Sequence, residues 1–140
     1  SIVKWDNRQA MALVAAGYQP GDTILLLPNF VSSIPEYYLP PAAYAAVRTV
    51  PSYDAKGRPR NSPTQLAEDI DRQVGPSRRV WVIATWQEVP RIALDRTLTT
   101  GWLAGQGFAR TQDRQLRRIR VTLYEIGKQR GFFINPGGTP

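Results

Sequence analysis

Two groups of side chains in this sequence could hold a ligand. Aromatic and acidic residues follow the predicted strands, and arginines gather in a basic segment late in the chain. An aromatic ring beside an arginine can hold a sugar or a single-stranded base. The candidate ligand-binding residues are therefore Phe30, Tyr53, Trp86, Glu88, Arg118 and Arg120. A structural explanation competes for both groups, because aromatic rings also close hydrophobic cores and a charged strand edge prevents aggregation.

Acid–base catalysis is the other chemistry that these positions allow. Asp54 and Glu88 are the carboxylates nearest the predicted strand ends, so a small hydrolase would have to use them. Asp22 follows a proline and a glycine, where an aspartate usually stabilises a turn. The chain contains neither histidine nor cysteine, which excludes a Ser-His pair, thiol catalysis and thiolate zinc sites.

Glycine-rich phosphate-binding loops are missing from the sequence. A dinucleotide site needs glycines directly after the first strand, but that position reads Pro28-Asn29-Phe30. Gly105 and Gly107 precede a predicted strand rather than a helix, so they form no P-loop. We therefore expect no cofactor and no metal in this chain, and the small hydrolase that would use Asp54 or Glu88 stays an open alternative.

The charge balance favours an anionic partner. The chain carries 18 basic and 11 acidic residues, a net charge of +7, and 15 of the basic residues are arginine. Arginine suits planar, two-point binding of phosphate or carboxylate. Phosphate-bearing small molecules, anionic lipid head groups and nucleic acid would all satisfy this charge. Nucleic acid has no further support, because no recognition-helix, zinc-finger or ribonucleoprotein signature is present.

Helices and strands that would position these residues alternate along the chain. Amphipathic spacing and capping signals predict helices over residues 5–17, 32–38, 62–74 and 92–104. Unbroken or alternating apolar runs predict strands over residues 23–27, 79–84, 108–112 and 119–126. The last two are expected to form an antiparallel pair around a polar turn near Asp113, with residues 119–126 half exposed.

The segment 44–50 has mixed signals. Its alanines favour a helix, whereas Val47-Arg48-Thr49-Val50 before a proline favours a strand. We interpret it as a strand. Residues 51–62 are rich in proline, glycine and charge and are expected to form a loop.

This order predicts one small three-layer α/β/α domain over residues 1–130, with a mostly parallel sheet and a C-terminal antiparallel hairpin. Residues 131–140 are expected to be a disordered tail. Ligands of such sheets bind outside the carboxyl ends of the strands, which is where most of the candidate residues lie. Because the chain starts at Ser1 without an initiator methionine, we expect it to be a piece of a longer protein.

Several short segments resemble a known family when they are taken in order. They are a helix headed by Trp5, residues 19–28 (Gln-Pro-Gly-Asp-Thr-Ile-Leu-Leu-Leu-Pro), residues 35–38, residues 79–83, Gly107-Phe108 and residues 121–124. Over residues 4–126 this series resembles the soluble carboxyl-terminal domain of bacterial membrane glycosyltransferases. These enzymes are of the dolichyl-phosphate-mannose protein mannosyltransferase type, in the GT-C superfamily.

The resemblance implies a non-catalytic accessory domain on the extracytoplasmic side of the cell membrane. The parent enzyme would transfer a sugar from a polyprenyl-phosphate carrier, and its catalytic acidic residue would belong to the membrane portion. The domain would contact that membrane portion of the same polypeptide and help to position the polyprenyl-phosphate sugar or the glycan acceptor. The alternative is a free-standing α/β binding module for a phosphate-bearing ligand or nucleic acid.

Overall fold

The computed structural model describes residues 7–27, 33–50, 56, 58, 62–85 and 90–127 of the chain. Its helices are α1 (Asn7–Gly17), α2 (Ser33–Tyr38), α3 (Pro41–Tyr44), α4 (Pro63–Val74) and α5 (Pro90–Gly105). Its strands are β1 (Thr23–Leu27), β2 (Val47–Thr49), β3 (Arg79–Thr85), β4 (Phe108–Leu116) and β5 (Ile119–Ile126).

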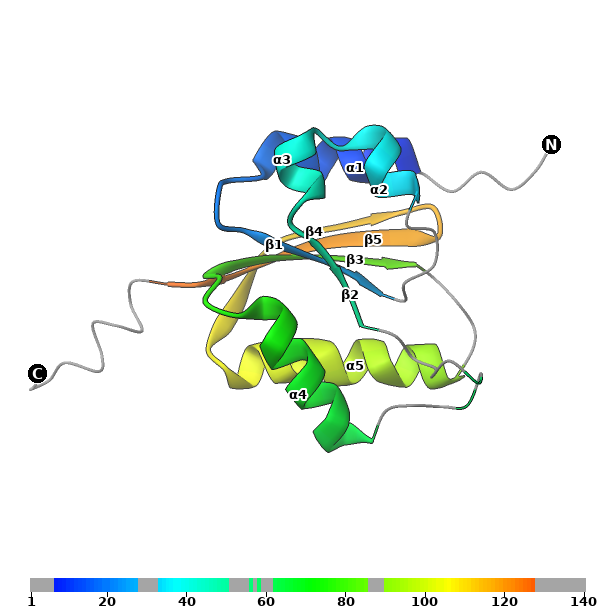
Figure 1. Cartoon of the computed structure of the whole chain (residues 1–140), viewed down its shortest axis with the longest axis vertical. Helices are drawn as coiled ribbons and strands as arrows, with labels where there is room; N and C mark the ends of the chain where they lie inside the picture. Colours follow the sequence, from blue (N-terminus) through cyan, green and yellow to red (C-terminus); the bar gives the residue numbers. More distant parts are fainter. Residues whose placement is uncertain are drawn as a thin grey trace, which may run out of the picture.

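The strands form one five-stranded mixed sheet in the order β2-β1-β3-β5-β4. β1 pairs in parallel with both β2 and β3, whereas β5 runs antiparallel to both β3 and β4. Helices α1, α2 and α3 cover one face, and α4 and α5 cover the other (Figure 1). The α/β architecture and the closing hairpin agree with the sequence prediction. The mostly parallel sheet agrees only in part, because half of the strand pairs are antiparallel.

Each face of the sheet has its own hydrophobic core, because neighbouring residues of a strand point to opposite faces. Ile24, Leu26 and Trp81 pack with α1 on one face. Leu25 and Val82 pack with α4 and α5 on the other. All five residues of β1 are buried, as expected for a central parallel strand covered on both sides.

Local signals account for the elements around the sheet. The Ser62 hydroxyl accepts a hydrogen bond from the Gln65 amide at 3.1 Å and starts α4, which ends at Gly75 with φ of 55°. The mixed segment divides in two: Ala45 and Ala46 follow the end of α3, and the predicted strand is confirmed as β2 over Val47–Thr49. On α2, Tyr38 packs against the core while Tyr37 is 80% exposed.

Two predictions for the hairpin are wrong. The turn lies at residues 117–118, and Asp113 is inside β4, which extends to Leu116. β5 is not half exposed: it lies between β3 and β4, and most of its residues are buried. The polar residues that suggested a turn belong to the exposed edge strand β4, for which water on one side permits a polar sequence.

Candidate functional site

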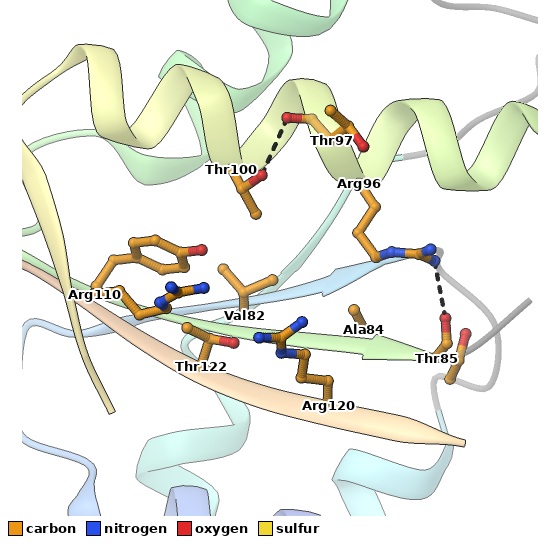
Figure 2. A pocket seen from close by; sticks show the side chains of 10 residues that line it. Val82, Ala84, Thr85, Arg96, Thr97, Thr100, Arg110, Arg120 and Thr122 are labelled. Carbon is orange, nitrogen blue, oxygen red and sulfur yellow. Dashed lines mark hydrogen bonds between the residues drawn. The ribbon is translucent and has the colours of Figure 1, made fainter. Parts of the chain in front are cut away.

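A pocket of about 230 Å³ lies between α5 and the sheet (Figure 2). It reaches Thr85, the last residue of β3, and so approaches the carboxyl end of that strand. Its lining combines three arginines, four threonines, a tyrosine and two small apolar residues. They are Val82, Ala84, Thr85, Arg96, Thr97, Thr100, Arg110, Arg120, Thr122 and Tyr124.

The register of the sheet brings the strand residues of the pocket together. Val82 of β3 pairs with Thr122 of β5, and Ala84 pairs with Arg120. Residues paired across neighbouring strands share one face of the sheet. On the far side of β5, Tyr124 pairs with Arg110 of β4. The pocket floor is therefore apolar along β3 and becomes cationic toward β5 and β4.

Asp113 links two of the pocket arginines. Its carboxylate accepts hydrogen bonds from Arg120 Nε at 2.7 Å and from Arg120 Nη2 at 2.5 Å. Arg110 Nη1 lies 3.7 Å from the same carboxylate, and the Thr122 hydroxyl lies 3.5 Å from it. The hydrogen bond from Arg120 lowers the pKa of Asp113 below its usual value, so this carboxylate is negatively charged at neutral pH.

Helix α5 supplies the opposite wall. Arg96 Nη1 donates to the Thr85 carbonyl oxygen at 3.4 Å, which fixes its guanidinium at the end of β3 (Figure 2). The Thr100 hydroxyl donates to the Thr97 carbonyl oxygen at 3.1 Å. Across the pocket, burial raises the pKa of Tyr124, so its hydroxyl stays neutral and remains a hydrogen-bond donor at neutral pH. The pocket thus offers donors from α5 and from the sheet.

The charged side chains that line the pocket are arginines. Three guanidiniums line it, and the carboxylate of Asp113 pairs with the guanidinium of Arg120. Charged side chains near an apolar floor interact more strongly than they would in bulk water. The arrangement can therefore hold an anion with planar, multipoint hydrogen bonding.

Of the candidate residues from the sequence, Arg120 lines this pocket. Arg118 lies in the hairpin turn with φ of 59° and is not among the lining residues. Phe30, Tyr53, Trp86 and Glu88 lie outside the described residues, as does Asp54. These four aromatic and acidic candidates therefore stay a prediction.

Sequence reasoning missed most of the residues that do line the pocket. On α5, Thr100 lies four positions after Arg96 and three after Thr97, a spacing that a solvated helix face also shows. The sequence alone does not place Arg110 beside Tyr124, because their pairing depends on the register of β4 with β5. One usable signal was present: Arg120, Thr122 and Tyr124 alternate with Ile119, Val121 and Leu123, so they share one face of β5.

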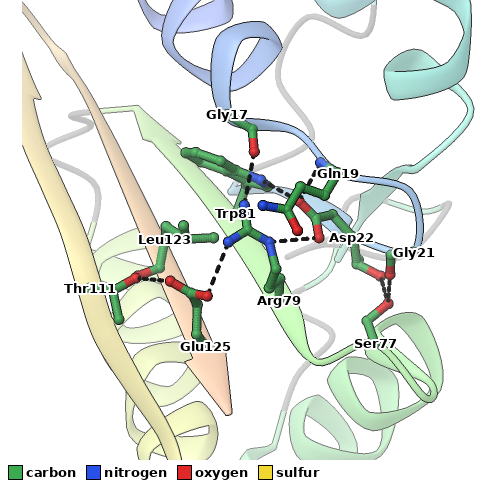
Figure 3. A network of polar contacts seen from close by, with 11 residues as sticks. Gly17, Gln19, Gly21, Asp22, Ser77, Arg79, Trp81, Thr111, Leu123 and Glu125 are labelled. Carbon is green, nitrogen blue, oxygen red and sulfur yellow. Dashed lines mark hydrogen bonds and ion pairs between the residues drawn. The ribbon is translucent and has the colours of Figure 1, made fainter. Parts of the chain in front are cut away.

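A second polar cluster lies at the start of β1 and β3 (Figure 3). The Asp22 side chain is 2% exposed and accepts hydrogen bonds from the Gln19 amide at 2.9 Å, Arg79 Nε at 2.9 Å and Trp81 Nε1 at 3.0 Å. Arg79 also donates to Glu125 at 3.0 Å and to the Gly17 carbonyl oxygen at 2.8 Å. Asp22 therefore stabilises the turn, as its position after Pro-Gly predicted, and also ties that turn to β3.

Comparisons with known proteins give no match: no protein-family model fits the sequence, and no curated protein matches it. Within the described ranges, no helix has both the length and the apolar character needed to cross a membrane. In the same part of the chain, no three acidic side chains lie close enough together to hold a metal ion.

Proposed function

We propose that this chain is a non-catalytic accessory domain of a membrane glycosyltransferase that uses a polyprenyl-phosphate sugar. In this proposal the domain helps to position the carrier or the acceptor on the extracytoplasmic side. The observation that carries the binding role is the pocket with Arg96, Arg110 and Arg120 beside the end of β3. A carrier phosphate is the kind of group that such a pocket attracts.

The state of the buried and paired carboxylates supports a non-catalytic role. A general base needs an oxygen that can take a proton, and its pKa works best near the operating pH. Asp113 and Glu125 both have pKa values lowered by hydrogen bonds, from Arg120 and Thr111 respectively. Asp22 is occupied by three donors. These groups are suited to holding arginines in place.

The native product in the source cell tests the membrane role. An antibody raised against this domain should detect a protein several times larger than 15.7 kDa, and that protein should sediment with membranes. The isolated domain should show no transfer from a polyprenyl-phosphate sugar. Turnover by the isolated domain would refute the non-catalytic assignment.

The positively charged pocket also favours a second candidate, a free-standing binding module for a phosphate-bearing ligand. A product of about this length in the supernatant would support that alternative and reject the membrane proposal. Its affinity for an anionic ligand should then fall steeply as salt is raised, because ion pairing in a partly exposed pocket is screened.

A further inference from the structure

We propose that the tip of the β4–β5 hairpin, residues 114–118, docks on an anionic lipid surface. The hairpin tip includes the end of β4 and the turn at residues 117–118. The two side chains that carry the inference are Arg114 and Arg118. The inference rests on the proposed function only for the presence of a membrane beside the domain, and it adds the surface that meets the lipid.

Exposed arginines dominate the charge of the hairpin tip. Between Phe108 and Arg120 the sequence has five arginines and one acidic residue, Asp113. The Asp113 carboxylate is hydrogen-bonded to Arg120 on the pocket side of the sheet, whereas Arg114 pairs with Val121 and lies on the other face. Arg114 and Arg118 are both exposed, and neither makes a hydrogen bond or ion pair within the described part of the chain. Both charges are therefore available to an anionic partner.

The backbone at Arg118 sets this turn apart. Leu116 pairs with Ile119, so residues 117–118 form a two-residue hairpin loop. Arg118 has φ of 59° and is the one non-glycine residue with positive φ among the described residues. Glycine or asparagine is preferred in that conformation. The sequence thus keeps an exposed arginine where another residue would stabilise the turn better, as is typical of residues that serve a function.

The place of the hairpin tip in the fold suits contact with a membrane. Ile119 pairs with Thr85, so the tip lies at the carboxyl end of β3. Helix α1 begins at the same end of the molecule (Figure 1), so a membrane portion that precedes this chain, as the proposed function requires, would join it there. The pocket reaches Thr85 and Arg120 at this end. A hairpin tip on the lipid surface would therefore bring the pocket close to a lipid-linked ligand.

An anionic lipid surface fits the hairpin tip better than nucleic acid does. Single-stranded bases are held by stacking on aromatic rings. The aromatic residues of the hairpin, Phe108 and Tyr124, are 8% and 7% exposed and lie away from the turn. The tip therefore offers charge without a stacking surface. Charge alone is enough for an anionic membrane, where each arginine near the surface strengthens binding about fivefold.

Co-sedimentation of the whole chain with phosphatidylglycerol vesicles tests the surface. In about 0.15 M salt, where the Debye length is about 8 Å, Arg114→Gln and Arg118→Gln should each weaken binding about fivefold. Arg78→Gln is the matched control, because Arg78 is exposed and precedes β3. The seven residues of β3 separate it from the tip by roughly 20 Å at ~3.3 Å per residue. It should therefore change binding by less than about twofold.

Arg118→Gly separates the charge of this residue from its backbone conformation. Glycine adopts positive φ without strain, so the thermal unfolding midpoint should rise by about 1–4 °C while vesicle binding falls about fivefold. Arg118→Gln should lose the same binding without that rise. Full vesicle binding by a folded Arg118→Gly variant would show that Arg118 serves only the turn, and would overturn the proposal.

Four further results would overturn the inference: no binding of the wild-type chain to phosphatidylglycerol vesicles, equal binding to phosphatidylcholine vesicles, equal losses for Arg78→Gln and Arg118→Gln, or tighter binding to an oligonucleotide than to the anionic vesicles. The wild-type measurements decide the matter if a variant fails to fold. Vesicle binding by a chain whose native product is small and stays in the supernatant would uphold the lipid-binding tip and reject only the glycosyltransferase proposal. A large, membrane-bound native product without vesicle binding by the chain would reject the tip alone.

Discussion

Replacing Asp22 with asparagine tests how strongly the second polar cluster holds the turn to the sheet. The carboxylate is almost completely buried, and its oxygens accept from Gln19, Arg79 and Trp81. An amide has one oxygen and one NH₂ group, so it cannot accept on both sides. Less stability is lost if the NH₂ group faces Arg79, because Arg79 keeps its hydrogen bonds to Glu125 and to the Gly17 carbonyl oxygen.

The expected cost follows from that orientation. One charge-assisted hydrogen bond contributes about 1.5–3 kcal/mol, and a buried guanidinium that loses one partner adds to the loss. We expect the Asp22→Asn variant to lose about 2–4 kcal/mol of unfolding free energy, a large fraction of the roughly 5–15 kcal/mol of an ordinary domain. With a slope of about 1–3 kcal/mol per molar urea, the midpoint should fall by about 1–2 M.

Urea unfolding followed by tryptophan fluorescence provides the measurement, since Trp81 is part of the cluster. Asp71→Asn is the matched control, because Asp71 is exposed on α4 and the same chemical change there should cost less than about 0.5 kcal/mol. A midpoint for Asp22→Asn within about 0.3 M of the wild type, at an unchanged slope, would refute the reasoning.

Two further predictions concern glycine positions and acid stability. Gly17→Ala should destabilise by about 1–3 kcal/mol, because its Cβ would lie 2.7 Å from two carbons of the buried Trp81 ring. Gly101→Ala has open space within α5 and should stabilise by about 0.5–1 kcal/mol, so thermal unfolding should show shifts of opposite sign. Hydrogen bonds from Arg120 and Thr111 lower the pKa values of Asp113 and Glu125 below their ordinary 3.8 and 4.5. Groups with lowered folded-state pKa values stabilise above the unfolded value, so stability should fall as pH drops below about 4.5. A double variant with Asp113→Asn and Glu125→Gln should lose less stability than the wild type as the pH is lowered. An equally steep loss in the double variant would show that these two carboxylates are not its cause.

The sequence was informative wherever a local signal was strong. The Pro-Gly-Asp turn before β1, the Ser62 cap and the unbroken apolar runs of β1 and β3 each determine structure over a few residues. The layers on both sides of the sheet followed from alternating helices and strands. The position of the hairpin turn did not follow, because residues 111–115 of β4 are exposed and as polar as a turn.

Most of the pocket could not be predicted from the sequence, because it depends on which strands pair with each other. Nothing in the composition of β5 indicates that it lies beside β3 instead of at the edge. That placement is what sets Arg120 beside Ala84 and brings Arg110 and Asp113 to the same cavity. The contribution of α5 was hidden for a different reason, since threonines and arginines on a helix face resemble a solvent-exposed surface.

The place of β5 in the sheet has a consequence for how the domain can be made. β5, the last strand among the described residues, is inserted between β3 and β4, so the sheet has a gap at its middle until residues 119–126 are available. During synthesis on the ribosome, earlier segments can form helices and the β1–β3 pairing, but neither core can close. A ribosome paused before Ile126 would hold an incomplete sheet whose exposed β3 edge is a target for chaperones and proteases.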